Sequence, residues 1–165
     1  MPPALLDYMK KLYASLVLAV LLLMMDVLRQ PCFFVYGEGV CIASVPMAAD
    51  LPFSVRFIHS VQKTPVLENL VAKKDGSGLE LVSTKYQSFG VGLPFMESEG
   101  DFRVEGEFYV FDRMGRKFRE VSLRTGVGTE LVLFFGGKEY RLYEKFPPGT
   151  RIDLFVAPMY KRWLI

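Results

Sequence analysis

A long apolar run near the N-terminus places the strongest constraint on what this chain can fold into. Lys10 and Lys11 precede the run, which extends from Leu12 to Met25 and meets its first charge at Asp26. As a helix rising about 1.5 Å per residue, the run spans roughly 21 Å, less than the roughly 30 Å hydrocarbon core of a bilayer. The apolar residues 27 and 28 bring it close to spanning length. The pattern is typical of a membrane-inserted helix and of a secretory signal.

Two outcomes of export remain open for this segment. Signal cleavage needs small residues near the site, and residues 24–30 (MMDVLRQ) offer none, which favours an uncleaved signal anchor over residues 1–29. The positive-inside rule keeps Lys10 and Lys11 in the cytoplasm, with residues 10–28 in the cytoplasmic membrane and residues 30–165 outside as one extracytoplasmic domain. Cleavage would release that domain as an exported protein. Met9 fits the start of such a signal as well as Met1 does.

A third interpretation is a buried helix of a cytosolic domain. It is disfavoured because no other segment has a helical pattern against which such a helix could pack.

Composition and spacing exclude several functional classes. The 20 Lys and Arg residues nearly balance the 18 Asp and Glu residues, for a net charge of +2, so we expect no nucleic-acid partner. One His and two Cys are too few for a zinc finger or ribbon, which takes about four such ligands. The glycine-rich stretches lack the Lys and Ser/Thr spacing of a phosphate-binding loop. We therefore expect no metal and no other cofactor.

Beyond residue 31, short β-branched and aromatic runs alternate with clusters of Gly, Pro and Asp. This spacing predicts an all-β antiparallel domain, a sandwich or a partly open barrel, preceded by one N-terminal hydrophobic helix. Residues 104–112 and 116–123 are expected to pair as a hairpin. The predicted strands cover residues 32–36, 40–45, 53–60, 66–73, 79–86, 104–112, 116–123, 130–135, 138–143 and 151–156.

Cys32 and Cys41 are the only candidates for a disulfide, which an exported domain could hold. A hairpin loop at Gly37-Glu38-Gly39 would place Val35 opposite Cys41 and leave Cys32 three positions away, on the other face. Two separate thiols are favoured over a bridge, which non-reducing mass analysis would test.

A candidate polar cluster emerges from two consecutive predicted hairpins. A loop at residues 61–64 would place Phe57 opposite Glu68 and His59 opposite Val66, and the next turn would place Val66 opposite Tyr86. Because side chains alternate between faces along a strand, the cluster shares one face, whereas Ser60 lies on the other. The candidate residues for this cluster or for ligand binding are His59, Ser60, Glu68, Tyr86 and Ser88.

Three interpretations of this cluster are open. His59, Glu68 and Ser88 have the residue types of a hydrolytic triad, but no Gly-x-Ser-x-Gly turn surrounds the serine. A satisfied polar cluster in the core is favoured, followed by the lining of a small binding cavity. We therefore expect no catalytic residue. His59 and Glu68 alone are one or two ligands short of a metal site.

The sequence also resembles a prokaryotic domain-of-unknown-function family with the motifs HSVxxTPVxE and SFGxGLP. The first motif runs from His59 to Glu68, and the second runs from Ser88 to Pro94 and includes the loop residues Phe89, Gly90 and Gly92. Genes of this family tend to lie beside the membrane subunit and the solute receptor of tripartite ATP-independent periplasmic (TRAP) transporters of the TAXI type. The resemblance implies a partner among these subunits, and it brings no catalytic residues.

The expectation from the sequence is thus a non-enzymatic, membrane-tethered, extracytoplasmic accessory protein of a TAXI-type TRAP transporter. It would bind the membrane subunit or the solute receptor. The alternatives are a small-ligand binding β module with its cavity near His59 and Glu68, and a hydrolase.

Overall fold

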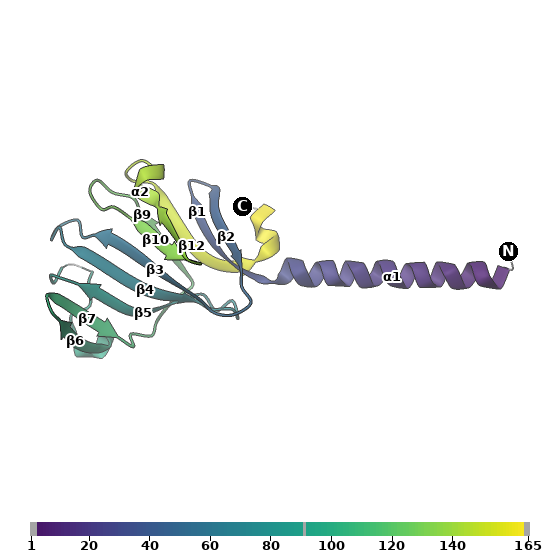
Figure 1. Ribbon diagram of the computed structural model, residues 1–165, viewed down its shortest axis with the longest axis horizontal. Coiled ribbons are helices and arrows are strands. Elements are labelled where there is room, and N and C mark those ends of the chain that lie inside the picture. The colour runs from purple at the N-terminus through teal and green to yellow at the C-terminus, as the bar shows by residue number, and fades with distance from the viewer. Residues whose placement is uncertain (1–2, 91, 164–165) are drawn as a thin grey trace.

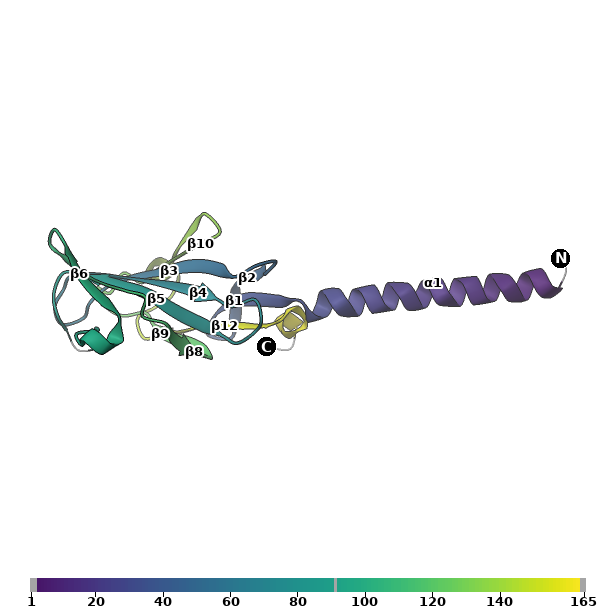
Figure 2. The same ribbon diagram turned by 90° about the horizontal axis from the view of Figure 1, so that it is seen from below.

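A computed structural model describes residues 3–90 and 92–163 and shows one long helix followed by a two-layered β domain (Figure 1). The helix α1 (Pro3–Arg29) extends away from the β domain in both views (Figures 1 and 2). Its segment Asp7–Arg29 has a mean hydropathy of 2.1, has no residue buried by the described part of the chain, and is long and apolar enough to cross a membrane. Only Gln30 separates α1 from the first strand.

The smaller layer is a four-stranded antiparallel sheet in the order β2-β1-β12-β9. The larger layer has eight antiparallel strands, of which seven follow the order β11-β10-β3-β4-β5-β7-β6 and β8 pairs with β5. The strands are β1 (Pro31–Gly37), β2 (Val40–Pro46), β3 (Leu51–Ile58), β4 (Pro65–Ala72), β5 (Leu79–Tyr86), β6 (Asp101–Glu105), β7 (Phe108–Asp112), β8 (Arg116–Phe118), β9 (Glu120–Arg124), β10 (Val132–Phe135), β11 (Lys138–Arg141) and β12 (Arg151–Pro158).

Neither sheet closes on itself, because β2 and β9 end one strand order and β11 and β6 end the other. The fold is therefore an antiparallel sandwich, as the sequence predicts, and not a barrel. Three short helices complete it: η1 (Glu97–Glu99), α2 (Leu142–Lys145) and η2 (Met159–Trp163). The core lies between the layers, where Phe33 and Leu154 of the small sheet meet Val55, Leu81 and Leu133 of the large one.

The strand directions give the sandwich two ends. β1 leaves α1 and β2 returns to it, so that Met47 N donates to Pro31 O at 2.9 Å beside the helix. β3 and β5 run away from this end, and β4 runs back toward it. The helix end therefore carries residues 29–31, 46–50 and 158–163, and the distal end carries the turns at residues 37–40, 59–64 and 124–129 with the start of the loop at 87–100.

Most predicted strands are confirmed to within a few residues, but the predicted hairpin of 104–112 with 116–123 is wrong. Residues 104–112 contain a turn at Gly106, whose φ of +60° favours glycine, and β6 pairs with β7 across it. Residues 116–123 divide instead between the two layers, because β8 pairs with β5 and β9 pairs with β12.

Cys32 and Cys41 are free thiols, the first buried and the second half-buried, as expected. Tyr36, not Val35, pairs with Cys41, because a bulge shifts the β1–β2 register between Val35 and Tyr36. Cys32 lies opposite Pro46, at the other end of this ladder. Burial raises the pKa of the Cys32 thiol to about 11.

Candidate functional site

The imidazole of His59 organises the turn that follows β3 at the distal end. His59 is only 6% exposed, and its Nδ1 accepts hydrogen bonds from the backbone N–H groups of Val61 at 3.2 Å and Gln62 at 3.1 Å. The backbone N–H of His59 donates to Thr64 O at 2.9 Å, which closes the turn. A ring nitrogen that accepts two N–H groups carries no proton, so the neutral ring holds its hydrogen on Nε2.

The glycine-rich loop after β5 lies directly against this imidazole. A Cβ on Gly90 would come within 2.9 Å of His59 Cε1 and Nε2, so no larger residue fits there without a shift. Ser88 Oγ donates to Gln62 Oε1 at 3.3 Å, and Gly92 adopts a φ of +87°, in the region that favours glycine. The two sequence motifs are therefore parts of one contact between a turn and a loop.

Tyr86 also holds this loop in place. Its hydroxyl donates a hydrogen bond to Pro94 O, and its ring is fully buried beside Val66, Leu93 and Phe111. Burial raises the pKa of Tyr86 to about 12, so the phenol keeps its proton and remains a donor to the carbonyl. Tyr86 is thus a structural residue of this end.

Glu68 is a half-buried carboxyl in the middle of the inward face of the large sheet. It pairs with Val55 on β3 and with Thr84 on β5, so the predicted Glu68–Phe57 and His59–Val66 pairings are wrong by two residues. A shift of two keeps each side chain on its face, which is why Glu68 still points inward. Burial raises the pKa of the Glu68 carboxyl, and the positive charge of Arg116 offsets part of this effect.

Two cavities share Glu68 and Gly92. One has a volume of about 280 Å³ and is bounded by the His59 turn and Leu93. The other has a volume of about 340 Å³ and lies between strands β4, β5 and β8 of the large sheet and strand β9 of the small one. Besides Glu68 and Gly92, the first is lined by Phe57, Ile58, His59, Ser60, Leu93 and Thr129, and the second by Leu70, Leu81, Arg116, Phe118, Glu120, Val121 and Ser122.

The structure therefore brings together three of the five predicted cluster residues. His59, Ser60 and Glu68 line the 280 Å³ cavity, whereas Tyr86 packs in the aromatic cluster and Ser88 binds Gln62. A triad needs the histidine Nδ1–H to face a carboxylate and its Nε2 to accept the serine proton. His59 has the opposite tautomer, so this geometry does not suit a triad. Among the residues that the structure describes, no three His, Cys, Asp or Glu side chains could hold a metal ion.

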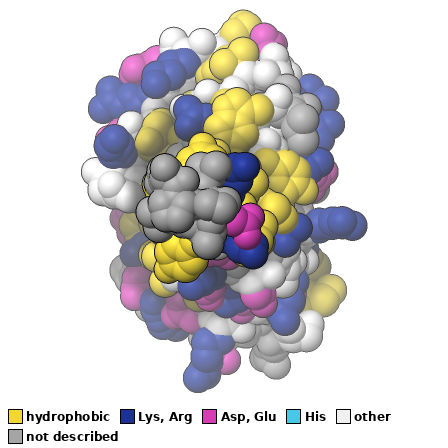
Figure 3. All heavy atoms as spheres, turned by 90° about the vertical axis from the view of Figure 1, so that its right-hand side faces the viewer, with side chains coloured by type: hydrophobic (Ala, Val, Ile, Leu, Met, Phe, Trp, Pro, Cys, Tyr) yellow, Lys and Arg dark blue, Asp and Glu magenta, His cyan; other side chains and the backbone are white. Residues whose placement is uncertain are grey.

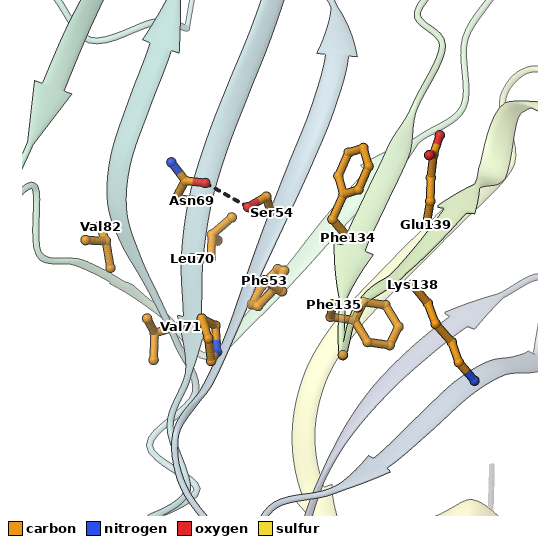
Figure 4. Close-up of a pocket in the computed structure, with 13 residues that line it drawn as sticks. Phe53, Ser54, Asn69, Leu70, Val71, Val82, Phe134, Phe135, Lys138 and Glu139 are labelled. Atoms are coloured by element: carbon orange, nitrogen blue, oxygen red, sulfur yellow. Dashed lines mark hydrogen bonds between the residues drawn. The ribbon is translucent and has the colours of Figure 1, made fainter.

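Two further hollows were not predicted from the sequence. The outer face of the large sheet carries a pocket of about 740 Å³, where Ser54 Oγ donates to Asn69 Oδ1 at 2.7 Å (Figure 4). Asn69 Nδ2 in turn donates to Ser83 Oγ at 2.9 Å, which forms a polar ladder across three strands. An asparagine within a strand was the sequence signal for this ladder, because Asn is depleted in strands.

The second unpredicted hollow, which we call the aromatic groove, has a volume of about 640 Å³ and is lined by Phe89, Phe95, Phe102 and Phe111 with residues 100 and 101. Phe95 is 67% exposed. The groove borders β6, an edge strand that lies far from α1 (Figure 1). Exposed aromatic side chains in such a concentration are typical of a contact surface.

Comparison with known proteins identifies the family but no activity. No curated protein and no solved structure matches the chain. Residues 53–142, more than half of the chain, match a domain of unknown function, DUF1850. This stretch runs from the third residue of β3 to just beyond β11 and includes the His59 turn, Glu68 and the loop from Ser88 to Pro94. The chain therefore belongs to the DUF1850 family.

Proposed function

We propose that this protein is a non-enzymatic accessory protein of a TAXI-type TRAP transporter, tethered to the cytoplasmic membrane by α1 with its β domain outside. The observation that carries the proposal is the exposure of α1. Its apolar side chains, among them Leu16, Leu22 and Leu23, are more than half exposed, and burying such surface is strongly favourable. A bilayer supplies that burial.

The orientation and the partner come from the sequence. Lys10 and Lys11 precede the span and favour a cytoplasmic N-terminus, which leaves the β domain outside. The motifs from His59 to Glu68 and from Ser88 to Pro94 support the association with a TAXI-type transporter. The His59 tautomer supports a non-enzymatic role, because the imidazole is used to hold the backbone of a turn.

The aromatic groove is the surface that we assign to the transporter subunit. It lies far from α1 (Figure 1), where a partner outside the membrane could reach it, and the charged residue Asp101 of β6 lines it beside the aromatic side chains. A mixed aromatic and charged surface is typical of protein interfaces.

Photo-crosslinking in native membranes tests this assignment. A benzophenone amino acid at Phe95 should crosslink the solute receptor or the membrane subunit, which mass spectrometry of the tagged, purified protein would identify. The matched control places the same probe at Val127, which is 83% exposed and also far from α1. Recovery of neither subunit from either position would contradict the association, and so would unchanged transport in reconstituted vesicles when the protein is added.

A second candidate function is the binding of a small ligand in the cavities that share Glu68. The observation in its favour is an inward-facing carboxyl beside hollows of 280 and 340 Å³. Glu68 and Glu120 both line the larger cavity and Arg116 is its single cation among the lining residues, so a small organic cation is the matching class.

Thermal unfolding in the presence of a panel of small amines tests this second function. A ligand at about 100 times its dissociation constant would stabilise the fold by about 2.7 kcal/mol. Glu68→Gln should abolish that shift, whereas Glu139→Gln, on the outer pocket, should retain it. No shift with any amine would count against the cation.

A further inference from the structure

The short C-terminal helix η2 lies against the base of α1. Met159 N donates to Gln30 O at 2.9 Å, and η2 contacts both α1 and β2. Leu28 is half-buried here, whereas the described side chains of α1 from residue 7 to residue 27 are exposed. The residues of η2 are therefore held at the level where α1 leaves the β domain.

This segment presents aromatic and basic side chains together. Trp163 is 65% exposed and Tyr160 is 38% exposed, with Lys161 and Arg162 between them. Arg29 adds a third positive charge at the last turn of α1. No carboxylate of the described residues forms an ion pair with these three cations, so their charge is not neutralised within the part of the chain that the structure describes.

The same end of the molecule is seen along the axis of α1 in Figure 3. Hydrophobic side chains surround the helix there, and Lys and Arg side chains stand among and around them (Figure 3). The apolar span of α1 ends at Asp26 and Arg29, so the headgroup layer of a membrane around α1 would begin at the level of η2.

We propose that η2 and Arg29 form an interfacial contact with the anionic phospholipid headgroups of the membrane that α1 enters. Trp and Tyr concentrate at the headgroup level because each has an apolar ring and a polar tip. Lys161, Arg162 and Arg29 attract the phosphates. This inference rests on the membrane insertion of α1, which is part of the proposed function. It adds that the β domain itself binds the lipid surface.

Trp163 supplies the measurement, because it is the only tryptophan in the chain. The full chain is reconstituted into lipid nanodiscs of phosphatidylcholine, with and without phosphatidylglycerol. Emission is then measured against acrylamide in the water and against lipids brominated near the headgroup. We expect protection from acrylamide, strong quenching by the brominated lipid, and an increase of both effects with phosphatidylglycerol.

The variant Lys161→Gln/Arg162→Gln should lose the dependence on phosphatidylglycerol, because each charge near an anionic surface changes binding about fivefold. Its acrylamide quenching constant should rise several-fold. The matched control, Lys63→Gln/Lys145→Gln, removes two exposed positive charges from the β3–β4 turn and from α2, away from α1, and should behave as the unmodified chain (Figure 1).

Flotation of the same samples separates this inference from the anchor. A chain that floats with lipid while Trp163 stays open to acrylamide and insensitive to brominated lipid would overturn the interfacial contact and leave the anchor standing. A chain that does not float would overturn both. Equal changes in the two double variants would also overturn the contact, because they would show an effect of net charge alone.

Discussion

The two ends of the sandwich are built in different ways. At the distal end, polar groups are used inward: His59 binds the backbone of its turn, Gly90 lies against the imidazole, and Tyr86 binds Pro94 O. At the helix end, Tyr160 and Trp163 are left exposed beside cations that form no ion pair with any described carboxylate. The polar groups of the distal end are therefore used within the fold, whereas the cations and aromatic side chains of the helix end are available for contact.

This difference distinguishes residues that stabilise the fold from residues that are available for binding. The motif residues His59, Gly90 and Tyr86 hold a turn and a loop in place, so changing them should alter folding. In η2, the Met159 side chain packs beside Cys32, Phe34 and Tyr36. The other four side chains of η2 form no hydrogen bond or ion pair within the described part of the chain, so changing them should alter what the protein touches and leave folding unchanged. Unfolding experiments can test this difference between the two ends.

The largest effect is expected for His59→Ala. The substitution removes the acceptor of two backbone N–H groups and the ring that packs against Gly90, and it should destabilise the domain by about 3 kcal/mol. Urea unfolding of the full chain in detergent, followed by near-ultraviolet circular dichroism, would measure it. Ser60→Ala, at an exposed neighbour, is the control. A loss below about 1 kcal/mol would show that the imidazole does not hold the turn.

A smaller loss is expected for Tyr86→Phe. The ring contacts remain while Pro94 O loses its donor, which should cost about 1–2 kcal/mol in the same assay. Tyr109→Phe keeps the neighbouring ring contacts and serves as the comparison. Equal losses of stability for the two substitutions would show that the Tyr86 hydroxyl does not stabilise this end.

At neutral pH, Glu68→Gln is expected to increase the stability of the domain, by less than Tyr86→Phe decreases it. Folding raises the pKa of Glu68 above its usual 4.5, so the folded state binds its proton more tightly than the unfolded state. The contribution of the Glu68 carboxyl to stability is therefore most favourable below about pH 4 and falls as the pH rises through its folded pKa. Thermal unfolding should show Glu68→Gln to be more stable than the unmodified chain at pH 7 and equal to it near pH 4. A gain of the same size at both values would contradict the role of ionisation.

The smallest effect is expected for Lys161→Gln/Arg162→Gln. The two side chains have no ion-pair partner among the described residues, so unfolding in detergent should change by no more than about 0.5 kcal/mol. A loss as large as that of Tyr86→Phe would show that η2 stabilises the sandwich, and the contrast between the two ends would disappear.

Local patterns predicted most of the strands, because alternation and turn residues act over a few positions. The predicted β4–β5 pairing of Val66 with Tyr86 follows from such a pattern and is confirmed. The β3–β4 register could not be obtained in this way, because the imidazole of His59 and the positive φ of Lys63 widen the turn. The turn at Gly106 was missed because apolar alternation continues on both sides of it.

The candidate site was predictable only in part for a related reason. The inward direction of Glu68 follows from side-chain alternation, which a slip of two residues preserves. The cavity beside it forms because β8 and β9 belong to different sheets. This arrangement depends on tertiary packing and is not visible in any local sequence pattern. The aromatic groove depends likewise on the β6–β7 turn. Phe95 and Phe102 are near in sequence, but only the fold sets them beside Phe111.

The single residue between α1 and β1 restricts the reach of the domain. A flexible linker would let a tethered domain sample a volume that grows with linker length, and its effective concentration near a partner would vary accordingly. If α1 is inserted in a membrane as proposed, the linker is Gln30 alone and its carbonyl is bonded to Met159, so the domain stays at a fixed height above the bilayer. Encounters then depend on lateral diffusion, and the partner must present its surface at that height. Flexible residues inserted after Gln30 would let the domain reach partners at other distances from the membrane.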